Sequence, residues 1–298
     1  MVSDPPAAPT DRASALLRER VRAVFKRLPK GLAGNEEAVH QMRVAGRRLR
    51  VAIPLLARKP EGKRARRAVR VLRELTRAAG ASRDLDVCLD LLNAHLRETG
   101  AAPSRETIAL RRRLRTARSR SRAQMAEALL DLEIARLRRD LRKILARKAD
   151  GLFGILGRIR ATRSEEGRGL LAGFRGLGDR YDPEALHALR RQARRLRYAA
   201  EVHDFLMRDE PSAAPALFKS LQEQIGALHD VHVLAGWLAA QARAATERGQ
   251  TAQTEAAAAL QAAFEGKARD IHRALLEAEP SEIASRALLA LGRNRPAA

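Results

Sequence analysis

Several residue types are scarce in this chain, and each scarcity excludes a class of structure. The single cysteine, Cys88, cannot form an internal disulfide or a cysteine-based zinc finger. Aromatic residues make up only 3% of the sequence, which argues against binding of single-stranded nucleic acid by base stacking. No apolar run approaches the ~20 residues that a membrane-spanning helix needs. The sequence therefore predicts a protein without disulfides and without a membrane span.

A secretory signal is also lacking from the first residues. The opening stretch, MVSDPPAAPTDR, contains no basic region followed by an apolar one. Residues 1–10 are expected to form a disordered tail. Because the lone cysteine also suits a reducing compartment, the sequence predicts a cytoplasmic protein.

Negative charge is scarce relative to positive charge. The chain has 58 basic and 35 acidic residues, a net charge of +23 and a pI of about 11.5. Only eight of the basic residues are lysine and 50 are arginine, whose planar guanidinium grips phosphate oxygens in pairs. This balance predicts a polyanionic partner. The candidates are nucleic acid, an anionic membrane and polyphosphate. A GC-rich genome would also enrich arginine, but it would not explain where the arginines lie.

Helix signals fill the sequence, and no convincing strand is found, so the predicted fold class is all-α. Asn35 and Ser104 are expected to cap helices, and Asp182-Pro183 to start another. Pro29, Pro54 and Gly80 are expected to end or kink helices. Eight glycines in residues 151–182 predict a connector with, at most, short helical pieces. The expected helices cover about 11–28, 35–54, 62–79, 82–99, 104–148, 183–208, 212–225, 228–248 and 252–278, with a short one after Pro280.

Two motifs occur twice in the same order. VHQMRVAGRRLR, from Val39 to Arg50, matches LHALRRQARRLR, from Leu186 to Arg197, at an offset of 147 residues. GASRDLDV, which begins at Gly80, matches GALHDVHV, which begins at Gly226, at an offset of 146 residues. Two ordered matches at nearly one offset predict a duplicated helical unit. We expect repeats at 11–150 and 183–298, forming two helical bundles about a pseudo-two-fold axis.

The first motif concentrates positive charge on one face of a helix. At about 100° per residue, its histidine and three of its arginines fall within an arc of about 80°, while Met42 and Leu49 lie on the opposite side. Like charges at these spacings repel. A solvated polar face is the alternative, but it usually mixes signs, and neither stripe contains an acidic residue. The two predicted stripes are His40, Arg43, Arg47 and Arg50, and His187, Arg190, Arg194 and Arg197, with Arg48 and Arg195 on their shoulders.

The repeated motifs resemble those of the CHAD family, the conserved histidine α-helical domain. The resemblance rests on both histidine–arginine motifs, on Tyr198 and Glu201, on GASRDLDV and on LQEQIGALHDV, and it extends from about residue 11 to 279. It implies two four-helix bundles with a central basic groove, binding of inorganic polyphosphate, and association with polyphosphate granules. The predicted polyphosphate-binding residues are His40, Arg43, Arg47, Arg48, Arg50, Arg73, His187, Arg190, Arg194, Arg195, Arg197 and Lys219.

Other chemistry has weaker support in the sequence. No nucleophile–base pair, carboxylate dyad or phosphate-cradling loop is visible, so no enzyme activity and no cofactor are predicted. Some CHAD relatives carry a triphosphatase domain with an E-x-E-x-K signature, which this sequence lacks. His229 and His232, with Asp230 or His203, are an alternative metal site. Asp84 and Asp230, which match between the repeats, are expected to orient or neutralise an arginine, or to cap a helix. Backbone-directed nucleic-acid binding and a scaffold role remain alternative functions.

Overall fold

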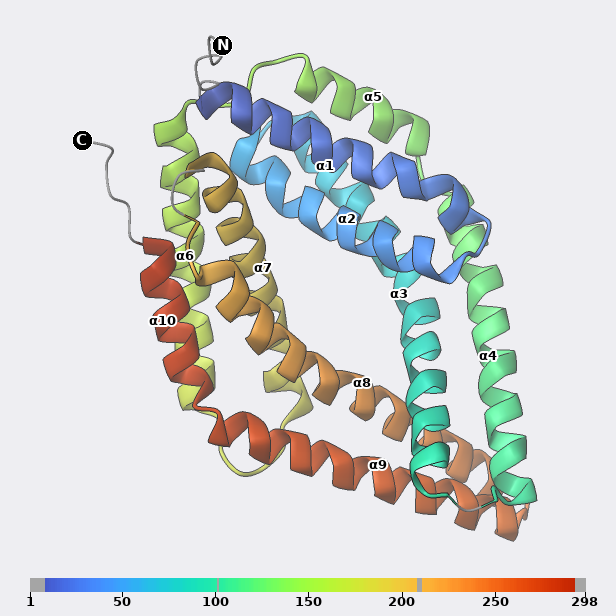
Figure 1. Ribbon diagram of the computed structural model, residues 1–298. Helices are drawn as coiled ribbons and strands as arrows, with labels where there is room; N and C mark the ends of the chain where they lie inside the picture. The colour runs from blue at the N-terminus through green and yellow to red at the C-terminus, as the bar shows by residue number, and fades with distance from the viewer. Residues whose placement is uncertain (1–8, 101, 208–210, 293–298) are drawn as a thin grey trace, which may run out of the picture.

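The computed structural model describes residues 9–100, 102–207 and 211–292. It contains ten α-helices and no strand within these ranges, which confirms the all-α prediction (Figure 1). None of these helices combines the length and the apolar character needed to cross a membrane. Residues 1–8 of the expected tail lie outside the described residues. The helices are α1 (Pro9–Leu32), α2 (Glu36–Leu56), α3 (Lys63–Glu98), α4 (Arg105–Leu130), α5 (Ile134–Leu145), α6 (Leu152–Arg175), α7 (Pro183–Met207), α8 (Ala214–Thr246), α9 (Thr251–Glu277) and α10 (Pro280–Gly292).

The three predicted helix starts are correct. The side chains of Asn35, Ser104 and Asp182 each accept a hydrogen bond from a backbone N–H two or three residues further on. These bonds satisfy donors that the first turn of a helix leaves free. They fix where α2, α4 and α7 begin, and α2 and α7 carry the two arginine stripes.

The predicted stops at prolines were wrong by a few residues. Helix α1 passes through Pro29 and ends before Gly34, whose φ of 79° lies in the left-handed region. The N–H of Asn35 donates to the carbonyl of Lys30 and that of Gly34 to the carbonyl of Gly31, which is the Schellman arrangement. Helix α2 similarly includes Pro54 and ends at Leu56. In both cases the proline lies so near the helix end that few backbone hydrogen bonds are lost.

The predicted breaks at Gly80 and near Gly226 were also wrong. Both glycines lie inside unbroken helices, α3 and α8. A glycine inside a helix costs only about 1 kcal/mol, and α3 buries Thr76, Ala79 and Ser82 on either side of Gly80. Burial of the flanking residues therefore outweighs the local preference for a break.

The segment from Ser104 was predicted to form one helix as far as residue 148, but it forms two. Helix α4 ends at Leu130, and α5 begins at Ile134 after a short turn. This reversal lets α5 bury Leu137 and Leu141 against the core while Leu129 stays buried at the end of α4. A single straight helix would not bring both apolar stretches to the protein interior.

The predicted glycine-rich connector is mostly the 24-residue helix α6. Several of its glycines allow neighbouring helices to approach closely. A Cβ added to Gly173 would lie 2.5 Å from Leu189 of α7, and one added to Gly167 would lie 2.7 Å from Leu288 of α10. Glycine therefore serves helix packing here, and the connector shrinks to residues 176–182.

Helix contacts follow the same pattern in the two halves of the chain. The pairs α1–α2, α2–α3, α3–α4 and α3–α5 recur as α6–α7, α7–α8, α8–α9 and α8–α10. Contacts between the halves follow the same symmetry. The α1–α7 contact is matched by the α2–α6 contact, and α2–α7, α3–α8 and α4–α9 each join a helix to its equivalent in the other half. Figure 1 shows α4 and α9 meeting at the far ends of the long α3 and α8 arms. This pattern is the one that a pseudo-two-fold duplication predicts.

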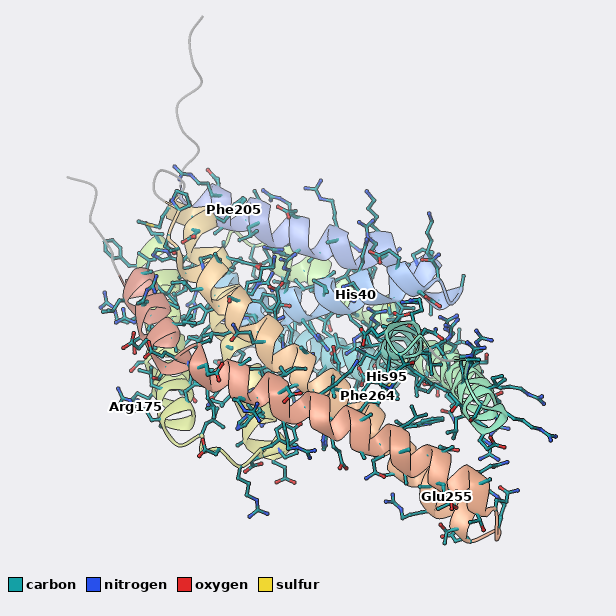
Figure 2. The ribbon with its side chains drawn as sticks, turned by 60° about the horizontal axis from the view of Figure 1, so that its bottom comes forward. His40, His95, Arg175, Phe205, Glu255 and Phe264 are labelled. Atoms are coloured by element: carbon teal, nitrogen blue, oxygen red, sulfur yellow. The ribbon has the colours of Figure 1, made fainter. Side chains whose placement is uncertain are left out.

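One hydrophobic core joins the halves. The main cluster of buried residues has members from all ten helices, and a smaller cluster packs beside it between α1, α2, α3 and α4. At the α3–α9 contact, His95 lies against Phe264, with ring centroids 5.1 Å apart (Figure 2). The shared core holds the two stripe-bearing helices in fixed positions relative to one another.

The packing role of the α6 glycines predicts opposite effects for two alanine substitutions on one helix. Gly173→Ala should lower the free energy of unfolding by about 1–3 kcal/mol, because its Cβ would overpack the buried Leu189. Gly157→Ala should raise it by about 0.5–1 kcal/mol, because no atom lies within 4 Å of the new Cβ. Urea denaturation measures both free energies of unfolding, provided that the dependence on urea concentration is the same for the variants and the wild type. Stabilisation by Gly173→Ala would contradict the packing role.

Candidate functional site

The two arginine stripes come together where α2 contacts α7. Desolvation by burial lowers the pKa of Arg194, and Arg47 of the opposite stripe is the next cause. Arg190 in turn contributes to the lowered pKa values of Arg43 and Arg47, after burial. Coulomb interaction weakens with distance, and α2 contacts α7 directly. The four arginines therefore form one cluster built from both halves, and we call Arg43, Arg47, Arg190 and Arg194 the central arginine cluster.

Arg43 and Arg190 are the members of this cluster that have carboxylate partners. Arg43 is only 8% exposed, and its Nη1 donates to the backbone carbonyls of Ala79 (2.9 Å) and Gly80 (2.6 Å) of α3. It also lies 3.6 Å from Asp84 Oδ1. The matching pair, Arg190 Nη2 and Asp230 Oδ1, is 3.9 Å apart. The prediction that the two aspartates orient an arginine is confirmed at both positions.

Arg47 and Arg194 are the members of this cluster that have no hydrogen-bond or salt-bridge partner among the described residues. Within the described residues, neither side chain makes a hydrogen bond or a salt bridge, although both are partly buried. Burial lowers the pKa of both groups, and it lowers that of Arg194 to about 9. Both therefore stay charged at neutral pH. These are cations held out of bulk water with no carboxylate to neutralise them, which is costly unless an anion binds.

Arg48 and Arg197 instead belong to a network around Glu201. Its Oε1 lies 2.9 Å from Arg48 Nη2 and 3.3 Å from Arg197 Nε, and its Oε2 lies 3.4 Å from Arg20 of α1. Arg48 and Arg197 also lie over the ring of the buried Tyr198, within 5.8 and 5.9 Å of its centroid. This carboxylate of α7 ties α1 and α2 to α7 through Arg20 and Arg48, whereas Arg197 pairs with it within α7.

The outer end of the first stripe opens into a cavity of about 550 Å³ between α2, α3, α6 and α7. Arg50, Arg73, Arg191 and Arg195 line it, with Glu166 as the one carboxylate, which pairs with Arg195. Burial, followed by Arg73 and Arg47, lowers the pKa of Arg50. The cavity therefore extends the positive surface beyond the central arginine cluster.

Lys219, the counterpart of Arg73 in the second repeat, does not extend that surface. It is exposed on α8 and lies 3.5 Å from Glu223 of the same helix. No salt bridge or hydrogen bond within the described residues joins it to the central arginine cluster. Its inclusion among the predicted binding residues has no support in the geometry.

His40 and His187 lie at the exposed starts of their stripes, His40 near the beginning of α2 (Figure 2). Burial and then neighbouring arginines, Arg83 for His40 and Arg191 for His187, lower the pKa of each. The His187 ring lies 5.7 Å from that of His229 on α8. Burial and then Arg190 lower the pKa of His229 to about 4. Before a ligand binds, these imidazoles are neutral at pH 7.

Arg83 and His229 lie at the candidate site but are not among the residues predicted to bind polyphosphate, although His229 was part of the alternative metal site. They occupy equivalent positions, 146 residues apart, in the second repeated motif. Arg83 acts on the pKa values of His40, Arg43 and Asp230. The match between the two motifs could have identified them. It places Arg83 directly before Asp84 and His229 directly before Asp230, the aspartates that lie beside Arg43 and Arg190.

The described part of the chain contains no cluster of potential metal ligands. No group of three or more His, Cys, Asp or Glu side chains there lies close enough together to hold an ion. His232 contacts the ring of Tyr181, and His203 lies 3.3 Å from Asp204. The histidines of the alternative metal site thus have separate surroundings.

Known proteins provide an independent comparison. The CHAD domain model matches residues 15–239. The CHAD domain structure from the plant Ricinus communis superposes with a TM-score of 0.60 at 21% identity, covering 99% of this chain and 95% of that one. PptA from Streptomyces chartreusis gives a TM-score of 0.65 at 17% identity, covering 97% and 100%. No curated protein sequence matches significantly. The two structures share the fold, and the family match, which spans both arginine stripes, shows that the chain belongs to the CHAD domain family.

Proposed function

We propose that this protein binds inorganic polyphosphate, without catalysis, at the central arginine cluster. The observation that carries the proposal is the pair Arg47 and Arg194, partly buried and without a carboxylate partner. An anion with closely spaced charges would relieve the repulsion between them and accept charge-assisted hydrogen bonds from both guanidinium groups. Polyphosphate is such an anion, and it is also the ligand that the CHAD resemblance implies.

The shape of the site favours a chain over a single phosphate. From Arg43 to Arg50 the first stripe extends ~10 Å along α2, and the adjoining cavity of about 550 Å³ adds Arg73 and Arg195. Successive phosphoryl groups would meet successive arginines along this path. We further propose that this binding associates the protein with polyphosphate granules in the cytoplasm.

The central test is Arg47→Glu combined with Arg194→Glu. Each guanidinium that loses a charge-assisted bond to phosphate removes ~1.5–3 kcal/mol, so we expect the affinity for long-chain polyphosphate to fall at least ~100-fold at physiological salt. Titration calorimetry measures the affinity, and circular dichroism checks that helicity is retained. Arg43 is unsuitable for this test because it is also bound to the α3 backbone.

The matched control reverses two exposed arginines, Arg139→Glu in α5 and Arg269→Glu in α9, which make no salt bridge with any described residue. The net charge changes equally, yet the affinity should fall less than ~5-fold, because exposed charges are screened. Similar losses from both double variants would mean that binding reflects net charge alone. Competition by duplex DNA at equal phosphate concentration tests the nucleic-acid alternative, and stronger binding of DNA would favour it.

Binding should depend on pH through His229. In the free protein its pKa is about 4, and a bound polyanion near Arg190 and His187 would raise that pKa. The complex then holds a proton that the free protein lacks, so affinity should rise as pH falls from 7 to 5. His229→Gln should flatten this rise, measured at constant ionic strength. Identical pH profiles for both proteins would show that His229 does not face the ligand.

We expect the purified protein to release no orthophosphate from polyphosphate, with or without Mg²⁺ or Mn²⁺. The described residues near the central arginine cluster supply cations and two aspartates, each beside an arginine, and phosphoryl transfer needs groups that position a metal or a nucleophile. A malachite green assay measures release. Metal-dependent turnover that Arg47→Glu and Arg194→Glu abolish would contradict the non-catalytic assignment.

A further inference from the structure

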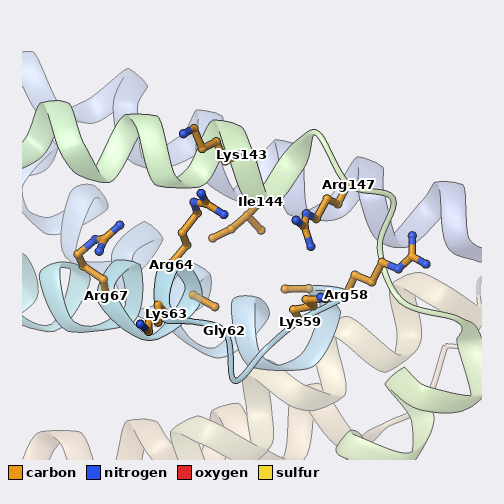
Figure 3. A pocket seen from close by; sticks show the side chains of 11 residues that line it. Arg58, Lys59, Gly62, Lys63, Arg64, Arg67, Lys143, Ile144 and Arg147 are labelled. Atoms are coloured by element: carbon orange, nitrogen blue, oxygen red, sulfur yellow. The ribbon is translucent and has the colours of Figure 1, made fainter.

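A second basic cavity lies at the opposite end of α2 from His40. It has a volume of about 430 Å³ and lies between the loop after α2, the start of α3 and the end of α5 (Figure 3). Ala57 in its wall lies ten residues beyond Arg47, or ~15 Å along the helix axis. It shares no lining residue with the cavity that holds Arg50 and Arg73. It is therefore separate from the site of the proposed function.

Seven cations and no carboxylate line this cavity. The loop after α2 contributes Arg58 and Lys59, and the first turns of α3 contribute Lys63, Arg64 and Arg67. Lys143 and Arg147 come from the end of α5 and the residues after it.

Only one of these cations is neutralised by a salt bridge. Arg67 holds Asp140 of α5 through two hydrogen bonds of 2.6 and 2.7 Å. The other six make no side-chain hydrogen bond or salt bridge within the described residues. Arg64 and Arg147 lie on either side of Ile144 (Figure 3). The Arg67–Asp140 pair thus fixes α3 against α5 and leaves the other cations available to a ligand.

The backbone adds to this positive potential. Helix α3 is 36 residues long, and its N-cap, Gly62, provides no side-chain cap for the first N–H groups. The positive end of the helix dipole therefore lies in the wall formed by the cations. The cavity has guanidinium forks, ammonium groups and backbone donors, which together suit phosphoryl oxygens.

The duplication does not explain this cluster. An offset of 147 residues places Phe205 and Leu206 opposite Arg58 and Lys59, and the segment that follows contains Asp209 and Glu210. At this offset none of the seven lining cations matches a basic residue, although Arg208 lies in the same segment. A cation cluster present in only one repeat is not a by-product of the duplicated stripes, so it calls for a ligand of its own.

We propose that this cavity is a second anion site, which binds a compact oligophosphate group of about three phosphates. Its volume suits a ligand of that size. The group can be the end of an inorganic phosphate chain or the triphosphate of a nucleotide, since both present the same oxygens. The site does not depend on the proposed function of the central arginine cluster.

The test uses inorganic triphosphate and the full chain that carries Arg47→Glu and Arg194→Glu, in which the central cluster is disabled. Titration calorimetry should still show one equivalent of triphosphate bound. Adding Arg64→Glu and Arg147→Glu should weaken this binding at least tenfold. The matched control adds Arg66→Glu and Lys148→Glu, exposed neighbours that do not line the cavity, and should weaken it less than threefold.

Each outcome decides between the site and general electrostatics. Absence of triphosphate binding in the central variant, or equal losses from the cavity pair and its control, would overturn the second site. Either result leaves the polyphosphate titration of the wild type unaffected, so failure here is distinguishable from failure of the proposed function. Equal affinities for inorganic and adenosine triphosphate support the site with a phosphate chain as ligand, and tighter binding of the nucleotide supports it with a nucleotide as ligand.

Discussion

Positive charge from both halves of the chain is concentrated where α2 meets α7, and the fold must hold it there. Burial is the largest cause of the lowered pKa values of Arg43, Arg47 and Arg194, so each pays a desolvation cost as well as repulsion from its neighbours. The compensation is graded. Arg43 has two carbonyls and an aspartate, Arg190 has a more distant aspartate, and Arg47 and Arg194 have none. The unneutralised charge therefore lies on Arg47 and Arg194, whose side chains are only partly buried.

The opposite faces of the same helices stabilise this arrangement. Met42 and Leu49 of α2 and Leu196 of α7 are completely buried, and each buried side chain of this size contributes roughly 1.5–3 kcal/mol. Glu201 adds ionic contacts to Arg20, Arg48 and Arg197, on three helices. The apolar faces and this one carboxylate thus oppose the repulsion that would separate α2 from α7.

The sequence was sufficient to predict which residues share a helix face. It was insufficient to predict how deeply each arginine side chain is buried and which groups it contacts. Helical periodicity placed Arg43 and Arg47 on one stripe, and the equal offsets of two motifs indicated that Asp84 and Asp230 would act alike. No periodicity distinguishes the carbonyl-bound Arg43 from the unpaired Arg47, because that depends on how closely α3 packs.

Glycine was the main source of error in the predicted helix boundaries. Its local preference for turns was read as a break at Gly80 and throughout residues 151–182, whereas a preference of about 1 kcal/mol is small beside the burial of flanking residues. At Gly173 the absence of a side chain is itself what packing requires. Gly34, Gly100 and Gly249 have positive φ and follow the ends of α1, α3 and α8, which is the position that glycine favours after a helix. Contacts from distant helices, which a local pattern does not contain, separate these cases.

The two halves of the central site have different chemistry despite their matching helices. In the first half the residue next to the aspartate is Arg83. In the second half the equivalent residue is His229, which lies next to His187 and is neutral at pH 7. Arg190 is correspondingly less tightly held than Arg43, with one distant aspartate and a buried Nε that has no hydrogen-bond partner. A phosphate chain offers the same oxygens to both halves, so the difference lies in the residues that meet it. The first half has one site imidazole, His40, whereas the second has His187 and His229, and we therefore expect more of any dependence on protons, and of any rearrangement of an arginine on binding, in the second half.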